Sequence, residues 1–276
     1  MHSDFSDIIG AQHALRAVVK TEFDEFYHYY HKRFQKTYKG YDKGEFTITH
    51  NSWLNDLAVE MCLKQLILER PHLNNCIVTP VYSHSILTSL SESKVYQELL
   101  ASKKSYGRYL IPTESILFQF FLEWCLQNHK VANLSGNQIK QIIIPILINK
   151  HYTIAVVKLT NTKFNKLAHI EFYNSFGDNL GAAQQDGLKS FFRKLGFIPK
   201  YENIAKHDQK DSYNCGVFII YKALEIASKN TGVDEVLLPM TSMGTQNYEQ
   251  TFLNARNLVA SILEAQNINV LLATAS

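Results

Sequence analysis

The sequence predicts an α+β fold in which helices pack against a central, antiparallel-rich sheet. Three short runs, at 141–148, 152–159 and 167–173, are rich in β-branched and aromatic residues and are separated by turns rich in Asn and Lys. This pattern predicts consecutive antiparallel strands. Apolar residues at helical spacing dominate the segments on both sides of these runs. A block of strands flanked by helices is typical of α+β proteins.

Each helical segment follows from its own pattern. Residues 5–37 are rich in helix formers and aromatic residues, which predicts an N-terminal helical extension. Leucines recur near helical spacing over 53–68 and stop before Pro71, and residues 114–129 are apolar around most of a helical circumference. Beyond the three strands, the same criteria predict a helix, a strand, a helix packed on several sides and a final amphipathic helix, at 182–195, 198–204, 217–227 and 248–265 respectively.

Composition and charge exclude several classes of protein. Hydrophobic residues make up 46% and charged residues 19% of the chain, as in a folded globular protein. The 28 basic and 25 acidic residues leave a net charge of +3, so we expect no nucleic-acid partner. No apolar run approaches the ~18 residues of a transmembrane segment. The start of the chain lacks the basic and apolar regions of a secretory signal, which predicts a cytoplasmic protein.

The four cysteines, Cys62, Cys76, Cys125 and Cys215, have neither C-x-x-C spacing nor a histidine at zinc-ligand distance. The sequence therefore predicts neither a metal site nor a disulfide framework. A single cysteine combined with a distant histidine and an Asn or Asp is a pattern of intracellular thiol enzymes, and this chain has the residues for it.

Cys215 lies at the start of the helix predicted at 217–227, after two residues that can cap a helix, Ser212 and Asn214. A thiol at this position feels the positive end of the helix dipole, which predicts a lowered pKa and a reactive thiolate. Gly216 would let a substrate backbone come close. The alternative is a small buried residue, which is the commoner role of a single cysteine at a helix start.

His151 and Asn174 lie on the two strands of a predicted hairpin. If its loop is centred between Thr162 and Lys163, the numbers of partner residues sum to 325, which pairs His151 with Asn174. Cross-strand partners have Cβ atoms about 4.5 to 5.5 Å apart, within reach of a hydrogen bond between the amide oxygen and the imidazole. This bond would fix the tautomer of His151 and leave its other nitrogen free. Taken singly, each residue could instead belong to a turn.

Three blocks of sequence resemble the ubiquitin-like-protein-specific proteases of cysteine peptidase clan CE, in matching order: WLNDLAVEMCLKQLI at 53–67, IIIPILINKHYTIAVVKL with HIEFYNSFG within 142–177, and QKDSYNCGVFI at 209–219. The family reads W-L-N-D in the first block, P-I-x-x-x-x-H-W and then Y-D-S in the second, and Q-x-x-x-x-D-C-G in the third. The resemblance implies the clan CE fold, with a catalytic cysteine at the N-terminus of a buried helix.

The resemblance also implies a role for each matching residue. The expected catalytic residues are the nucleophile, its general base, the residue that orients the base and the side-chain donor of the oxyanion hole: Cys215, His151, Asn174 and Gln209. The expected substrate-binding residues line the channel for a Gly-Gly tail or lie at the modifier-binding surface: Trp53, Asp56, Tyr152 and Gly216.

Three positions depart from the family pattern. Asn174 replaces an Asp, which keeps the orientation of His151 but weakens the electrostatic support for its protonated form. Tyr152 replaces the Trp that follows the histidine, so that wall of the channel would be smaller, and Asn214 replaces the Asp before the cysteine.

The domain organisation follows from the blocks. We expect an N-terminal helical extension at 1–48, a protease domain at 49–265 with a variable insertion at 72–138, and a C-terminal tail at 266–276. The extension, the insertion and the three departures resemble the bacterial effector branch of the clan, which contains both deubiquitinases and acetyltransferases.

The resemblance implies a thiol isopeptidase that needs no cofactor and cleaves after the C-terminal Gly-Gly of ubiquitin or a ubiquitin-like modifier, with ubiquitin favoured. The alternatives are a SUMO- or Nedd-type deconjugating protease, an effector acetyltransferase that uses acetyl-CoA, and an inactive binding module. The expected partner is a ubiquitin-like protein, bound by a monomer. A bacterial effector of this kind would reach the host cell cytosol without a Sec signal.

Overall fold

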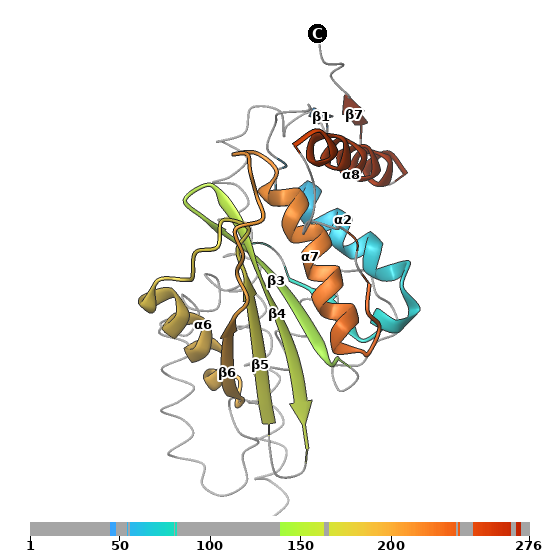
Figure 1. The fold of residues 1–276 in the computed structure, drawn as a ribbon. Helices are drawn as coiled ribbons and strands as arrows, with labels where there is room; N and C mark the ends of the chain where they lie inside the picture. The colour runs from blue at the N-terminus through green and yellow to red at the C-terminus, as the bar shows by residue number, and fades with distance from the viewer. Residues whose placement is uncertain are drawn as a thin grey trace, which may run out of the picture.

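The computed structural model of the chain describes residues 45–47, 54, 56–79, 81, 139–162, 166–235, 237, 245–265 and 269–271. It contains a mixed five-stranded sheet with helices packed against it (Figure 1), which confirms the predicted α+β class. The strands, in the spatial order β2-β3-β4-β5-β6, span Cys76–Val78, Gln141–Ile148, His151–Asn161, Lys166–Tyr173 and Ile198–Asn203. The helices predicted within 5–37 and at 114–129 lie outside the described residues.

The middle of the sheet is an antiparallel ladder of β3, β4 and β5, as predicted. A two-residue turn, Asn149-Lys150, joins β3 to β4, and both residues have positive φ, 49° and 65°. Positive φ at both positions defines the hairpin turn whose twist matches that of its strands. Ile148 pairs with His151 directly beside the turn, so the turn holds His151 at the first residue of β4.

The register of β4 against β5 corrects the predicted pairing. Ile154 pairs with Tyr173, so the numbers of partner residues sum to 327 and not to 325. The loop is therefore centred one residue later than predicted, because β4 continues to Asn161 and β5 begins at Lys166. Side chains alternate with a period of two residues, so a change of two in this sum keeps each residue on its face of the sheet.

Both outer strands run parallel to their neighbours. β6 pairs in parallel with β5, and β2 pairs in parallel with β3. β2 belongs to the segment predicted as a variable insertion at 72–138, yet all three of its residues are buried. The beginning of that segment is therefore an edge strand of the central sheet.

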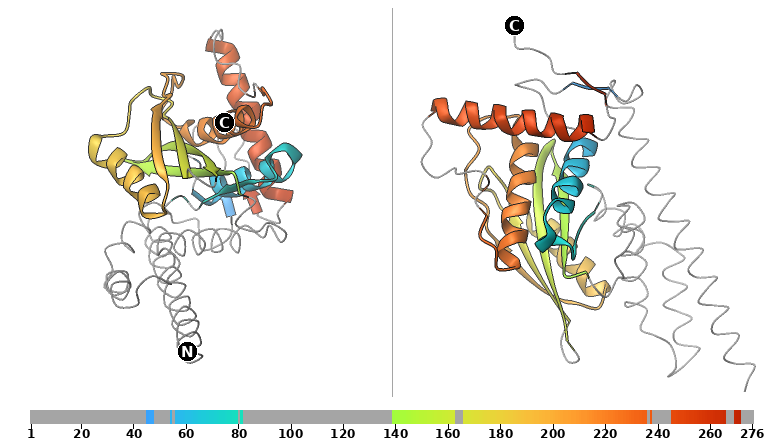
Figure 2. Two further views of the ribbon diagram at one scale, coloured as in Figure 1. Left: turned by 90° about the horizontal axis from the view of Figure 1, so that it is seen from below. Right: turned by 90° about the vertical axis from the view of Figure 1, so that its right-hand side faces the viewer.

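The described helices have bounds close to the predicted ones: α2 spans Asp56–Leu68, α6 spans Ala182–Lys194, α7 spans Cys215–Asn230 and α8 spans Thr245–Ala265. α7 packs on β4, α2 packs beside α7, and α6 packs beside β6. α8 crosses the N-terminal ends of α2 and α7 (Figure 2). In the described part of the chain, every helix is too short or too polar to cross a membrane.

The core lies between the sheet and α7. Of the 16 residues of α7, 12 are buried, as expected of a helix that is apolar on several sides. Alternate residues of β4, such as Ile154 and Val156, belong to the same hydrophobic cluster as this helix. Because close-packed interiors resist displacement, the core holds the N-terminus of α7, and with it Cys215, at a fixed position relative to β4.

Two short strands outside the main sheet bring distant parts of the chain together. β1, Glu45–Thr47, pairs in parallel with β7, Asn269–Leu271. Residues from the end of the predicted extension and from the predicted tail therefore lie side by side.

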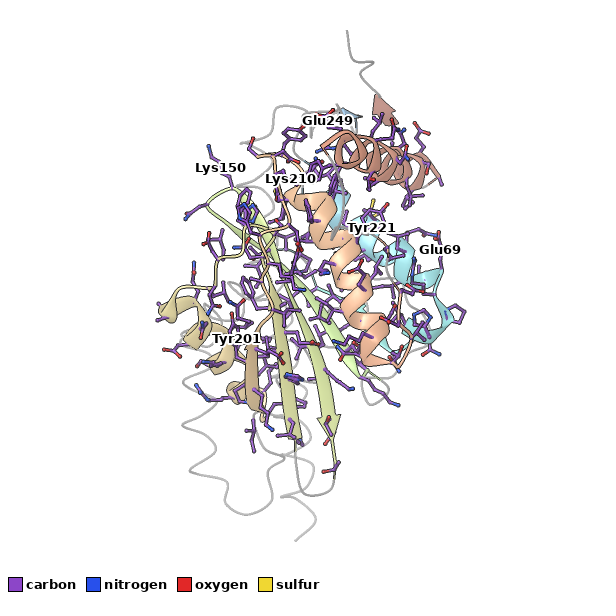
Figure 3. The ribbon with its side chains drawn as sticks, viewed as in Figure 1. Glu69, Lys150, Tyr201, Lys210, Tyr221 and Glu249 are labelled. Carbon is purple, nitrogen blue, oxygen red and sulfur yellow. The ribbon has the colours of Figure 1, made fainter. Side chains whose placement is uncertain are left out.

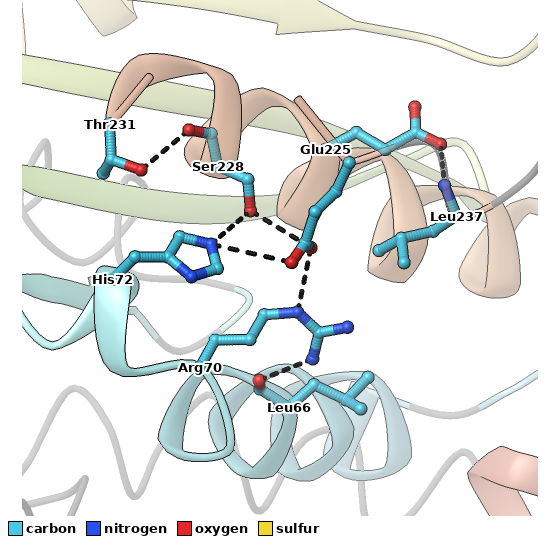
Figure 4. A network of polar contacts seen from close by, with 8 residues as sticks. Leu66, Arg70, His72, Glu225, Ser228, Thr231 and Leu237 are labelled. Atoms are coloured by element: carbon cyan, nitrogen blue, oxygen red, sulfur yellow. Dashed lines mark hydrogen bonds and ion pairs between the residues drawn. The ribbon is translucent and has the colours of Figure 1, made fainter. Parts of the chain in front are cut away.

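A polar cluster ties the C-terminal end of α7 to η2, a short 3-10 helix at Pro71–Leu73 (Figure 4). Glu235 Oε2 accepts hydrogen bonds from Arg70 Nε at 3.1 Å and from Ser228 Oγ at 3.3 Å, while Ser228 Oγ lies 2.9 Å from His72 Nε2. The serine and the carboxylate thus contact the same imidazole nitrogen. The histidine cannot relay a proton between them, so we interpret the cluster as structural.

We expect Glu235→Gln to lower the free energy of unfolding by about 1 kcal/mol, because it removes the charge from a carboxylate that accepts from both Arg70 and Ser228. For a chain of this size the melting temperature should fall by about 2 °C. Glu202→Gln is the matched control, since its contact with His169 is exposed and exposed pairs contribute little. Thermal unfolding followed by circular dichroism compares the two, and an unchanged melting temperature in Glu235→Gln would contradict the structural role of the cluster.

Candidate active site

The four residues predicted to act together lie on three segments of the chain at one end of the sheet. His151 begins β4, and Asn174 follows β5. Gln209 and Cys215 share the third segment, in which Gln209 lies in the loop before α7 and Cys215 begins the helix. A hydrogen bond of 3.0 Å from Gln209 N to Ser175 O brings that loop against the end of β5. Figure 3 shows Lys150 and Lys210, the neighbours of His151 and Gln209, at this end of the molecule.

The imidazole of His151 and the amide of Asn174 are in direct contact. His151 Nε2 lies 2.8 Å from Asn174 Oδ1, and the same oxygen accepts a hydrogen bond from the backbone N–H of Phe176 at 2.9 Å. Because a backbone N–H can only donate, the amide has its oxygen turned toward His151. Nε2 therefore carries the proton, and Nδ1 is the nitrogen whose lone pair can accept one.

The ring of Phe176, which the sequence analysis did not identify, fixes the plane of the His151 imidazole. The two rings are stacked, with centroids 4.3 Å apart and an angle of 15° between their planes. His207 holds Phe176 in turn, since its Nδ1 lies 2.9 Å from Phe176 O. Gly177 permits this approach, because its φ is +83° and a Cβ there would come within 3.1 Å of His207 N.

Burial lowers the pKa of His151 below its ordinary value of 6.5, although the hydrogen bond with Asn174 and the charge of Asp178 both act to raise it. The imidazole is therefore neutral at pH 7. A neutral imidazole with an unprotonated Nδ1 can take up a proton, which is what a general base must do.

The titration of His151 is a direct test of this environment. We expect its midpoint below pH 6.5 and a higher midpoint in Asn174→Asp, because a carboxylate beside the ring favours the imidazolium. NMR titration of the His151 ring protons in both proteins measures the two values. A midpoint above pH 6.5 in the unchanged protein, or no rise in the variant, would contradict the burial and the contact with residue 174.

The pKa of the Cys215 thiol is raised and not lowered as predicted. Its side chain is 1% exposed, and burial raises the pKa even though the backbone N–H groups of Tyr152 and Gly216 act to lower it. Cys215 does begin the helix, but the cost of desolvating a thiolate outweighs the positive end of the helix. The residue therefore rests as a neutral thiol.

The other described cysteines have a different environment. Cys62 and Cys76 are free and buried, and burial raises the pKa of Cys62 to about 12 and raises that of Cys76 as well. Cys215 differs from them because it begins a helix and has backbone N–H groups that favour its thiolate. Cys125 lies outside the described residues. Among the described residues, no group of three or more His, Cys, Asp or Glu is placed to hold a metal ion.

Gln209 is 1% exposed, and both ends of its amide are held. Ser175 Oγ donates to Gln209 Oε1 at 2.6 Å. Gln209 Nε2 lies 2.8 Å from the backbone oxygen of Asp211 and 3.2 Å from its Oδ1. Because both of these acceptors belong to Asp211, one N–H can serve them together as a three-centre bond.

Two of the predicted substrate-binding residues, Gly216 and Tyr152, are buried. A Cβ at Gly216 would come within 3.0 Å of Leu54 Cβ and 3.3 Å of Val59 Cγ2, so this glycine permits the close approach of α2 to α7. Tyr152 is 2% exposed and packs in the hydrophobic core. The part of both residues in substrate binding stays a prediction.

The W-L-N-D segment is described only in part. Trp53 lies outside the described residues, and so does the side chain of Asp56, which begins α2. Leu54, the residue after Trp53, is 3% exposed and packs at Gly216. Leu54 therefore lies close to the N-terminus of α7.

Two residues that hold the loop before α7 in place, Asp211 and Arg256, were not identified from the sequence. Asp211 accepts hydrogen bonds from the backbone N–H groups of residues 213 and 214, and an Asp shortly before a helix start is a signal of this turn. Arg256 is 2% exposed and stands between Phe252 and Val259 at helical spacing. A single Arg on an apolar helix face was the signal for it.

No protein-family model matches the sequence, and no curated protein matches it. Among solved structures, a de-sumoylating protease is 14% identical over 78% of this chain and 86% of its own, with a TM-score of 0.46. The Rickettsia bellii effector protein RickCE is 18% identical over 77% of this chain and 94% of its own, with a TM-score of 0.46. The Xanthomonas campestris effector protein XopD, solved bound to ubiquitin, is 15% identical over 74% and 91%, with a TM-score of 0.40. One of these three structures is thus a de-sumoylating protease, and the other two are bacterial effector proteins.

Proposed function

We propose that the protein is a thiol isopeptidase that cleaves after the C-terminal Gly-Gly of ubiquitin or a ubiquitin-like modifier, with ubiquitin favoured. The observation that carries this proposal is the contact between His151 Nε2 and Asn174 Oδ1, which leaves Nδ1 of the imidazole as the base. The backbone N–H of Tyr152, the residue after His151, acts on the thiol of Cys215. This contact supports the assignment of the base and the thiol to one site.

The proposed reaction has two stages, and neither needs a cofactor. His151 Nδ1 takes the proton of Cys215, and the sulfur attacks the carbonyl carbon of the last glycine. The protonated imidazole then gives its proton to the lysine amine as that amine leaves, and a thioester remains on Cys215. Water, deprotonated by the same imidazole, hydrolyses the thioester and releases the modifier with a free carboxylate.

Gln209 and the backbone N–H of Cys215 are the proposed oxyanion donors. The contacts of Gln209 Nε2 with Asp211 can be made by one of its two N–H groups, which leaves the second for the substrate. Donors held in place before the reaction stabilise the developing negative charge without reorganisation. The bonds at both ends of the Gln209 amide supply that preorganisation.

The raised pKa of Cys215 and the lowered pKa of His151 mean that both groups are neutral before substrate binds. Proton transfer between them creates an ion pair, so it becomes favourable when the substrate carbonyl and the oxyanion donors are in place. In this proposal the enzyme acts as a monomer on the tail of a ubiquitin-like partner, and as an effector it would act in the host cytosol.

Covalent capture tests the proposed function. The protein is incubated with ubiquitin whose C-terminal carboxylate is replaced by an alkyne electrophile, and in parallel with SUMO and Nedd-type equivalents. We expect an adduct on Cys215, found by mass spectrometry, that forms fastest with ubiquitin and is absent from Cys215→Ala. An adduct formed fastest with another modifier would reassign the substrate within the same class. No adduct with any of the three would contradict the proposed function.

A further inference from the structure

The loop before α7 is built around one carboxylate. Asp211 Oδ1 accepts hydrogen bonds from the backbone N–H groups of Tyr213 at 2.9 Å and Asn214 at 2.7 Å, and Asp211 Oδ2 accepts one from the hydroxyl of Tyr248 on α8. Burial raises the pKa of Asp211, but the hydrogen bonds from Tyr248, Asn214 and Tyr213 together hold it below its ordinary value. Asp211 is therefore ionised at pH 7 and acts as an acceptor only.

The side-chain amide of Asn214 forms hydrogen bonds with this carboxylate and with Arg256. Asn214 Nδ2 donates to Asp211 Oδ2 at 2.8 Å, and Asn214 Oδ1 accepts from Arg256 Nε at 2.8 Å. The carboxylate can only accept and the guanidinium can only donate, so the two neighbours fix the orientation of the amide. A second carboxylate at position 214 would face the first across the same short distance, where both cannot be ionised. A neutral amide satisfies both neighbours.

The same aspartate reaches the proposed oxyanion donor. Gln209 Nε2 contacts the backbone oxygen and Oδ1 of Asp211, while Arg256 Nη2 donates to Tyr213 O at 3.1 Å from the other side of the loop. Asp211 therefore joins the side chain of Gln209 to the residue that precedes Cys215. A displacement of Asp211 would move both groups that are proposed to hold the oxyanion.

We infer that Asp211 is a positioning residue of the reaction, and that its carboxylate works as a matched pair with the amide of Asn214 to set Gln209 and the N-terminus of α7 relative to each other. This inference rests on the proposed function. It assigns the pair a role in the rate of the chemical step and not in substrate binding, because neither side chain is needed to contact the modifier.

Exchanging the two side-chain types tests the pairing. In Asp211→Asn the amide oxygen can still accept from the backbone N–H groups of residues 213 and 214, but its NH2 group then faces the NH2 group of Asn214, and neither can accept. In the double variant Asp211→Asn/Asn214→Asp, the amide at 211 donates to the carboxylate at 214, and that carboxylate accepts from Arg256. Donors and acceptors then match among residues 211, 214 and 256, and the Tyr248 hydroxyl, which donates to the carboxylate at 211, accepts from the amide there instead.

The measurement is steady-state cleavage of a small Gly-Gly-based fluorogenic peptide. We expect Asp211→Asn to lower kcat by about 10²-fold with KM unchanged, since loss of one oxyanion donor costs about 10²- to 10³-fold. The double variant should recover at least ~10-fold of that loss, because complementary hydrogen bonding is restored. Glu235→Gln is the matched control, as it changes an acid to an amide in the cluster at the other end of α7 and should lower the melting temperature without changing kcat.

Each outcome decides the inference. Wild-type kcat in Asp211→Asn, or a double variant no faster than a folded Asp211→Asn, would overturn it. Should Asp211→Asn fail to fold, the double variant alone decides. A folded double variant with at least about a tenth of wild-type kcat supports the pairing, because an uncompensated loss costs ~10²-fold. An unfolded one overturns it.

Failure of the proposed function gives a different result. If the unchanged protein cleaves no Gly-Gly substrate, the proposed function is wrong, and hydrogen exchange at the backbone N–H groups of Tyr213 and Asn214 then reads the pairing directly. Faster exchange in Asp211→Asn that slows again in the double variant supports the pair. Equal exchange in all three proteins would overturn it.

Discussion

We expect the replacement of Cys215 with alanine to abolish the proposed cleavage after Gly-Gly and to leave the fold and the binding of the proposed modifier intact. The thiol is the group that would form the acyl-enzyme, and loss of a catalytic nucleophile costs on the order of 10⁶-fold in kcat. The side chain is small and lies in a core that extends along α7, so its removal leaves little unfilled space. Turnover of a fluorogenic modifier substrate, with binding measured by isothermal calorimetry, checks both halves of the expectation.

Cys62→Ala is the matched control for this variant. Cys62 is also free and buried, but burial raises its pKa to about 12, and it lies within α2 and not at the start of a helix. We expect it to keep wild-type turnover and to form the same probe adduct. Retained activity in Cys215→Ala, or an adduct on Cys62, Cys76 or Cys125, would mean that another sulfur is the nucleophile.

Replacing His151 with alanine should lower kcat by at least ~10³-fold, because it removes the proposed base for the thiol proton, which is also the proposed acid for the leaving amine. The raised pKa of Cys215 makes this loss large, since a buried neutral thiol does not ionise unaided at pH 7. Steady-state kinetics on the small peptide substrate measure the effect. A loss of less than tenfold would show that the thiol does not depend on this imidazole.

Asn174 variants separate orientation from charge. Asn174→Ala removes the oxygen that His151 Nε2 and Phe176 N share, and a base that is no longer aligned costs about 10²-fold, less than loss of the base itself. The Phe176 ring remains stacked on the imidazole, which limits the loss. Asn174→Asp should keep or increase kcat, because its carboxylate supports the imidazolium.

The same kinetics test the neighbouring acid. Asp178 is exposed and raises the pKa of His151 through its charge. We expect Asp178→Ala to have a smaller effect on kcat than Asn174→Ala, because an exposed charge is screened by solvent. A silent Asn174→Ala together with a severe Asp178→Ala would make Asp178 the partner of the histidine.

The local sequence pattern was sufficient to predict the strands and the helix on which the candidate site residues lie. The change from a helical period to β-branched runs predicted β3, β4 and β5, and the bounds predicted for β3 agree with those observed. The mixture of apolar residues on several sides of 217–227 predicted the buried α7, with Cys215 at its start. These features depend on residues that are near one another in the chain, so the periodicity of apolar residues in the sequence predicts them.

Contacts between distant segments were decided by the tertiary structure. The register of β4 and β5 depended on where each strand ends. The sum of partner residue numbers differs from the predicted sum by two, so His151 and Asn174 still lie on the same face of the sheet and are in contact. Gly216 permits the close approach of Leu54 and Val59, which no local pattern indicates.

The amino-acid sequence by itself determined the order of the strands and helices from β3 to α8 and which cysteine begins a buried helix, because those follow from the spacing of apolar residues. The protonation states and the hydrogen-bond partners followed only from the assembled fold. Desolvation raises the pKa of Cys215 against the expected effect of its helix, and Arg256 comes from a helix 42 residues away in sequence to fix the amide of Asn214. Burial and donor–acceptor matching depend on everything that surrounds a group, and those surroundings exist only once the chain is packed.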